Sequence, residues 1–142
     1  MTVRIQKENF SVSSEIATLT KGRSDIGAVV SFVGLVRDSS SNRQLKSMTL
    51  EHYPDMTEKE LVDIEKEANQ RWNLEASLIV HRIGELFPGD QIVLVVTCGR
   101  HRKETFEANE FLMDFLKTKA PFSHLGFTPL RRGFSFIQVQ HF

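Results

Sequence analysis

Apolar residues along this 142-residue chain alternate between short runs typical of strands and two longer stretches with helical spacing. Four runs rich in β-branched and aliphatic side chains are expected to be strands: 27–36 (GAVVSFVGLV), 45–52, 76–80 and 91–98. The glycine at position 34 predicts that the first run bends or approaches another part of the molecule closely at this point. We expect the first two runs to form a hairpin around the polar loop 38–43.

Two amphipathic stretches predict the helices. A capping-box sequence, TEKE, starts at Thr57, and apolar residues then recur at helical spacing up to Trp72, which predicts a helix over 58–72. The second helix is expected to reach Lys117 and to be closed by Pro121. With no repeat or linker, the pattern predicts one α+β domain over residues 1–142, in which two main helices pack on a mixed or antiparallel sheet.

Charge and cysteine usage exclude several classes of protein. The chain has 18 basic and 18 acidic residues, and this neutrality argues against a nucleic-acid-binding module or an anionic-membrane binder. The charged start, residues 1–8, does not resemble a secretory signal, and no apolar run is long enough to span a bilayer, so we expect a cytoplasmic protein. The single cysteine excludes an internal disulfide, and no ligand spacing predicts a metal site.

A cluster of cations follows the strand run 91–98, in the sequence Gly99-Arg100-His101-Arg102-Lys103. Such a turn at the start of a helix is a natural anion site, because free backbone N–H groups and cationic side chains point at it. The alternative is that these basic residues are simply solvated. Arg37 ends another predicted strand and could meet His101 and Arg102 at one sheet edge.

The remaining reactive side chains are best explained as structural. Cys98 stands at a strand end, where a small apolar filler is a simpler interpretation than a nucleophile. His52, His81 and His141 show no spacing that indicates a shared site.

Four motifs carry a resemblance to a known family: 27–37 (GAVVSFVGLVR), 50–59 (LEHYPDMTEK), 80–90 (VHRIGELFPGD) and 116–122 (LKTKAPF). Together they resemble the catalytic, or large, subunit of molybdopterin synthase, in register over most of the chain. The resemblance implies an α/β hammerhead-like domain that forms a homodimer. It also implies a ubiquitin-like small sulfur-carrier subunit docked on each copy, which gives a heterotetramer, and no metal or other cofactor.

The implied reaction is sulfur transfer. The carrier's C-terminal thiocarboxylate would donate sulfur to cyclic pyranopterin monophosphate, and two transfers would build the dithiolene of molybdopterin. The family's substrate pocket maps onto a set of residues that overlaps the cations found from spacing: Leu35, Val36, Arg37, His101, Arg102 and Lys117. The guanidinium and imidazole groups would bind the phosphate and polarise pterin oxygens. Lys117, in cationic surroundings, is the expected catalytic acid or base.

One departure from the family pattern concerns a second catalytic lysine. His124 stands in its place, and histidine is shorter and mostly neutral at pH 7, although it can exchange protons and contact an anion. The tail 122–142 also diverges from the family. Two functions therefore remain open: a working sulfurtransferase, or a catalytically weakened relative that binds the carrier or a phosphorylated pterin without efficient turnover.

Overall fold

The computed structural model describes residues 2–37, 45–51, 54–118 and 123–129. The strands are β1 (Thr2–Gln6), β2 (Ala28–Leu35), β3 (Leu45–Glu51), β4 (Ala76–Arg82), β5 (Gly84–Leu86), β6 (Gln91–Gly99) and β7 (Ser123–Pro129). The helices are α1 (Val12–Thr20), α2 (Pro54–Trp72) and α3 (Arg102–Thr118).

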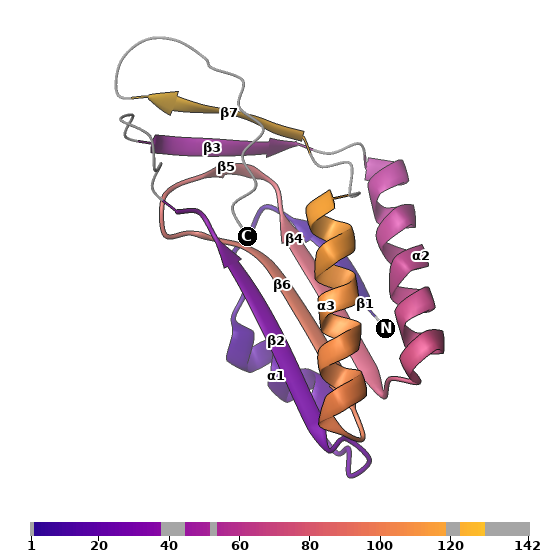
Figure 1. The fold of residues 1–142 in the computed structure, drawn as a ribbon. Coiled ribbons are helices and arrows are strands. Elements are labelled where there is room, and N and C mark those ends of the chain that lie inside the picture. The colour runs from indigo at the N-terminus through magenta and orange to yellow at the C-terminus, as the bar shows by residue number, and fades with distance from the viewer. Residues whose placement is uncertain (1, 38–44, 52–53, 119–122, 130–142) are drawn as a thin grey trace.

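The strands form two sheets. The larger is mixed and four-stranded, in the order β1-β4-β6-β2, with β1 parallel to β4 and the other neighbours antiparallel. The smaller has the order β5-β3-β7 and is antiparallel. In Figure 1 the smaller sheet lies at one end of the larger one, beyond the C-terminal end of α3.

The helices cover both faces of the four-stranded sheet (Figure 1). On one face, residues of α2 and α3 share a core cluster with alternate strand residues, among them Val93 and Val95. On the other face, α1 packs near the intervening residues Leu94 and Val96. Because side chains alternate along a strand, a central strand covered on both faces must be apolar at every position, and residues 92–96 are completely buried.

Most predicted elements are confirmed, but the predicted hairpin is wrong. β2 pairs with β6, from Ala28 opposite Gly99 to Leu35 opposite Gln91, whereas β3 belongs to the other sheet. The longer apolar run of β6 offers β2 a buried partner along its whole length, which a local hairpin with β3 would not. A register shift between Gly34 and Leu35 confirms the predicted irregularity.

Four elements lay outside the prediction, and one of them is β7, in the segment after the second predicted helix. β1 and α1 were missed because neither contains a fully apolar run: β1 has no buried residue among its five, and α1 has none among its nine. The short strand β5 was missed as well. The loop tip at 38–43 and the predicted helix stop at Pro121 lie outside the described residues.

Candidate functional site

The basic turn between β6 and α3 forms one candidate site. His101 precedes the first helical residue, and its backbone N–H donates to Glu104 Oε1 at 2.9 Å, which is half of a capping box. Thr105 Oγ1 donates to the His101 carbonyl at 2.6 Å. These bonds hold the turn in place while leaving the side chains of His101, Arg102 and Lys103 exposed.

The turn borders an open groove of about 460 Å³. Its lining residues are Gly27, Ala28, Arg100, His101, Arg102 and Lys103. Gly27 must be a glycine because a Cβ there would stand 2.1 Å from the Arg100 carbonyl oxygen. Cationic side chains around a helix N-terminus are the arrangement that the sequence analysis interpreted as a possible anion site.

The second group of predicted residues lies where β2 ends. Leu35 is 46% exposed and Arg37 is exposed, whereas Val36 is only 1% exposed. The Val36 N–H donates to the Asp90 carbonyl at 2.9 Å, and its own carbonyl accepts from Gly89 N–H at 2.6 Å. Val36 therefore anchors this end of β2 to the 87–90 turn, and the exposed side chains on either side of it are the ones that can meet a ligand.

Lys117 lies at the same end of the molecule as Arg37. Val36 and Leu116, their immediate neighbours in the chain, belong to one core cluster. Lys117 is exposed in the last turn of α3. His124 lies on β7 opposite Leu50 of β3, in the smaller sheet beyond this end of α3 (Figure 1). The structure thus brings Arg37 and Lys117 to one end, with the strand of His124 nearby.

Within a single chain the two groups of cations do not meet. Arg37 follows the end of β2, and His101 with Arg102 lies beside its beginning, so the seven residue steps of β2 separate them by about 23 Å. Along α3, the fifteen steps from Arg102 to Lys117 cover about 22 Å. The expectation that these cations meet at one sheet edge is therefore not met within one copy of the chain.

Other titratable groups have structural roles. Cys98 is fully buried, and burial raises the pKa of its thiol, which disfavours a nucleophilic thiolate. His81 is buried, with Nδ1 2.8 Å from the Arg82 carbonyl. The buried Glu65, which sequence reasoning missed, accepts a bond from Ser77 Oγ at 2.7 Å.

The described residues contain neither a cluster of metal-ligating side chains nor a membrane-spanning helix. Within residues 2–37, 45–51, 54–118 and 123–129, no three His, Cys, Asp or Glu side chains come together as a metal site. Among the helices of those same ranges, none is long and apolar enough to cross a membrane.

The fold and the two groups of cations, one at each end of β2, define the class of this protein: an α+β protein with two candidate anion-binding sites. The family model described as MoaE protein matches residues 5–119. The molybdopterin synthase catalytic subunit of Mesorhizobium japonicum is 53% identical over 121 residues, covering 85% of this chain and 75% of the relative. That of Ralstonia nicotianae is 52% identical, covering 85% and 69% of the two chains.

Solved structures agree with this likeness. The molybdopterin biosynthesis MoaE protein of Burkholderia ambifaria superposes with a TM-score of 0.80 at 44% identity, covering 94% of this chain and 92% of that one. Molybdopterin synthase from Staphylococcus aureus gives 0.79 at 29% identity, covering 91% and 96%. A complex of subunits 1 and 2 of the Helicobacter pylori molybdopterin-converting factor, at 18% identity, TM-score 0.74 and coverage of 87% and 82%, shares the fold.

The chain therefore belongs to the MoaE family, the catalytic subunits of molybdopterin synthase, and it acts in molybdenum cofactor biosynthesis as a sulfur-transfer enzyme.

Proposed function

We propose that this chain, in the cytoplasm, transfers sulfur from the C-terminal thiocarboxylate of a small ubiquitin-like carrier to cyclic pyranopterin monophosphate. A thiocarboxylate sulfur is a nucleophile, so it forms a C–S bond to an oxygen-bearing carbon of the pyranopterin, and the C–O bond at that carbon breaks as its oxygen takes up a proton. Water then replaces sulfur on the carrier's acyl carbon, and the carrier leaves as a carboxylate. The observation that carries the proposal is the placement of Arg37 and Lys117 at one end of the core, each next to a residue of the same buried cluster.

The roles of these two residues follow from their chemistry. A guanidinium such as that of Arg37 binds phosphate or a pterin oxygen through paired hydrogen bonds. Lys117, at the end of α3, is the acid or base that moves a proton as the C–S bond forms. Leu35, exposed beside Arg37, supplies an apolar wall.

We further propose that a second copy of the chain completes the site. In the described part of the chain, β2 is an outer strand that pairs only with β6. Two β2 strands joined antiparallel about a twofold axis would lay the beginning of one beside the end of the other. This arrangement would bring His101 and Arg102 of one copy toward Arg37 and Lys117 of the other.

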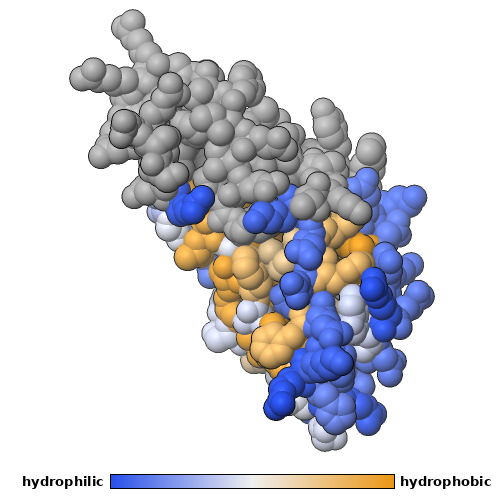
Figure 2. Space-filling model, viewed as in Figure 1, coloured by the Kyte–Doolittle hydropathy of each residue, from blue (hydrophilic) through white to orange (hydrophobic). Residues whose placement is uncertain are grey.

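Apolar surface along this edge supports the pairing. Val29 on β2 is 38% exposed and Phe106 on α3 is 60% exposed, while Phe32 and Met113 are only partly buried. Figure 2 shows apolar residues gathered on the face that carries β2 and α3, with hydrophilic residues among and beside them. Apolar patches with a polar border are typical of subunit interfaces.

The first test measures molybdopterin formation from thiocarboxylated carrier and cyclic pyranopterin monophosphate. We expect turnover by the unmodified chain and its loss in Lys117→Ala, with carrier binding retained. Undiminished turnover in Lys117→Ala would disprove the role of this lysine. Lys66→Ala, at an exposed position of α2, is a matched lysine control for the loss of a helix charge.

The variant His124→Lys decides between the two functions left open by the sequence. His124 lies beyond residues 5–119, which match the family. Turnover by the unmodified chain shows that histidine suffices at this position. Turnover that appears only in His124→Lys would identify the weakened relative that keeps its fold and its binding partners.

Mixing inactive variants tests the shared site. Lys117→Ala and Arg102→Ala would each be inactive alone, but in a mixed dimer one of the two sites would be intact. Random reassortment of equal amounts would then restore about a quarter of the wild-type sites, since half of the dimers are mixed and each has one intact site. No recovery, with mixed dimers demonstrated by tagged copies, would place all of the residues of a site within one chain.

A further inference from the structure

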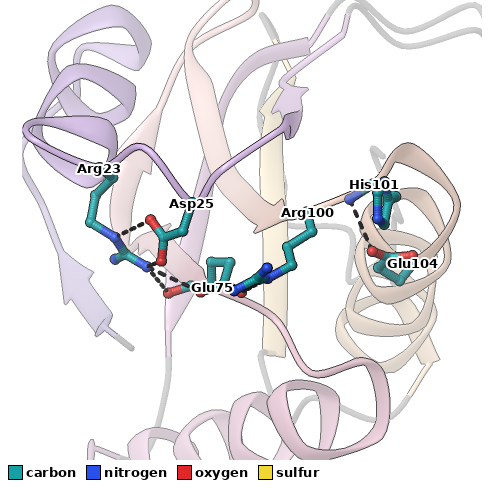
Figure 3. A network of polar contacts seen from close by, with 6 residues as sticks. All are labelled: Arg23, Asp25, Glu75, Arg100, His101 and Glu104. Atoms are coloured by element: carbon teal, nitrogen blue, oxygen red, sulfur yellow. Dashed lines mark hydrogen bonds and ion pairs between the residues drawn. The ribbon is translucent and has the colours of Figure 1, made fainter.

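A network of four charged side chains lies beside the basic turn (Figure 3). Arg23 and Asp25 come from the segment before β2, Glu75 from the turn between α2 and β4, and Arg100 from the residue before His101. Arg23 binds Asp25 through two nitrogen–oxygen contacts of 2.8 Å each. The network therefore connects three segments that are far apart in the sequence.

Glu75 is the centre of this network. Its Oε1 accepts from Arg100 Nε at 3.1 Å, and its Oε2 and main-chain carbonyl accept from Arg23 Nη2 at 3.4 and 3.1 Å. Its backbone N–H donates to the Cys98 carbonyl at 2.8 Å, just before the turn. The side chain of Glu75 is only 17% exposed, whereas that of Arg100 is 66% exposed. Glu75 thus holds both the strand end and the first cation of the turn.

The charges within the network balance. Two guanidinium groups face two carboxylates, and the hydrogen bonds from Arg23 hold the pKa of Asp25 well below its usual range. In Figure 3 the Arg100 side chain extends toward Glu75, while His101 lies on the α3 side beside Glu104. Arg100 is therefore paired with Glu75, whereas Arg102 and Lys103, next to the groove, form no ion pair within the described residues.

We propose that Glu75 is a positioning residue for the groove beside the basic turn. By holding Arg100, it fixes the main chain immediately before His101 and leaves His101 and Arg102 to contact the phosphate of the substrate. Gly27 packs against the Arg100 carbonyl from the other side, so the turn is fixed from two directions. The inference deepens the proposed function, because it rests on this groove receiving the substrate's phosphate.

The variant Glu75→Ala separates positioning from simple electrostatics. Removal of a carboxylate near an anion site should, by charge alone, tighten anion binding. Loss of positioning should instead weaken it, because the turn no longer holds its cations in one geometry. The sign of the change in phosphate affinity thus reports which effect dominates.

The experiment titrates inorganic phosphate into the ¹⁵N-labelled full chain and follows the amides of Arg102 and Lys103. We expect Glu75→Ala to weaken phosphate binding about twofold to fivefold, the effect typical of a partly exposed ion pair. In the assembled synthase, KM for the pterin should rise by the same factor with kcat unchanged. Arg100→Ala should also weaken phosphate binding. The double variant with both substitutions should bind phosphate at least as tightly as the single variant with the lower affinity. Glu67→Ala, an exposed carboxylate of α2, is the control and should change nothing.

Three outcomes decide the inference. Unchanged or tighter phosphate binding in Glu75→Ala would overturn it, and so would a wild-type chain whose turn amides do not respond to phosphate. Normal phosphate binding without any turnover would overturn the proposed sulfur transfer but not the role of Glu75. If Glu75→Ala does not fold, Glu75→Asp keeps the negative charge but shortens the side chain that holds Arg100. We expect Glu75→Asp to weaken phosphate binding, and unchanged or tighter binding in this variant would overturn the inference.

Discussion

Asn109, on the buried side of α3, joins the helix to two strands of the large sheet. Its Nδ2 donates to the Val30 carbonyl of β2 and the Val95 carbonyl of β6, both at 3.1 Å, and lies 3.4 Å from Thr97 Oγ1. The residue is 5% exposed. Because α3 has cations at both ends, this amide also fixes where those cations lie relative to β2.

We expect Asn109→Ala to lower the free energy of unfolding by about 2–3 kcal/mol. Two short hydrogen bonds of about 1 kcal/mol each are lost, and part of the cost of leaving their buried acceptors without a donor is added. Glu110→Ala, at an exposed position one residue further along the helix, should change stability by less than about 0.5 kcal/mol.

Urea unfolding followed by tryptophan fluorescence is the assay. Trp72 is the only tryptophan; it packs on Phe111 of α3 with ring centroids 5.1 Å apart and donates to Glu107 Oε2 at 3.0 Å. Its emission therefore reports the contact between α2 and α3. Measurements at one protein concentration keep any contribution from self-association constant. A loss below about 0.5 kcal/mol, equal to the control, would refute the energetic role of Asn109.

Three further predictions concern buried or crowded positions. Burial raises the pKa of Glu65, so its contribution to stability is present below the unfolded-state pKa of about 4.3 and is lost as pH rises through the folded-state pKa. Glu65→Gln, which keeps an acceptor for Ser77, should therefore gain stability over wild type as pH rises in urea titrations; a difference independent of pH would contradict this. Gly27→Ala should lower stability by more than about 2 kcal/mol in the same assay, because its Cβ would collide with the Arg100 carbonyl, and a neutral effect would show that the turn can shift freely. Cys98 should react with a thiol reagent only at the rate of unfolding, and rapid labelling of the native protein would show that its burial is transient.

The local pattern of apolar and polar residues determined most of the helices and strands. The continuous apolar run of β6 and the apolar periodicity of α2 and α3 are properties of neighbouring residues, so the sequence alone predicts them. The cations of the basic turn and Arg37 also stand at element ends that can be identified by eye. Motif resemblance went further, since it led to the family that the comparisons confirm.

Tertiary structure alone decided which elements pair and which charges meet. β2 pairs with β6, which is distant in the sequence, and not with β3, which follows it directly. Burial of a whole strand outweighs the lower entropic cost of closing a short hairpin loop. That pairing, with α3 running back along it, places Arg37 and Lys117 at one end and His101 at the other. Glu75 joins the basic turn only through contacts across 25 residues of chain, which no local pattern reveals. Sequence therefore determines which chemical groups are present, and the long-range packing of strands determines which of them can act together.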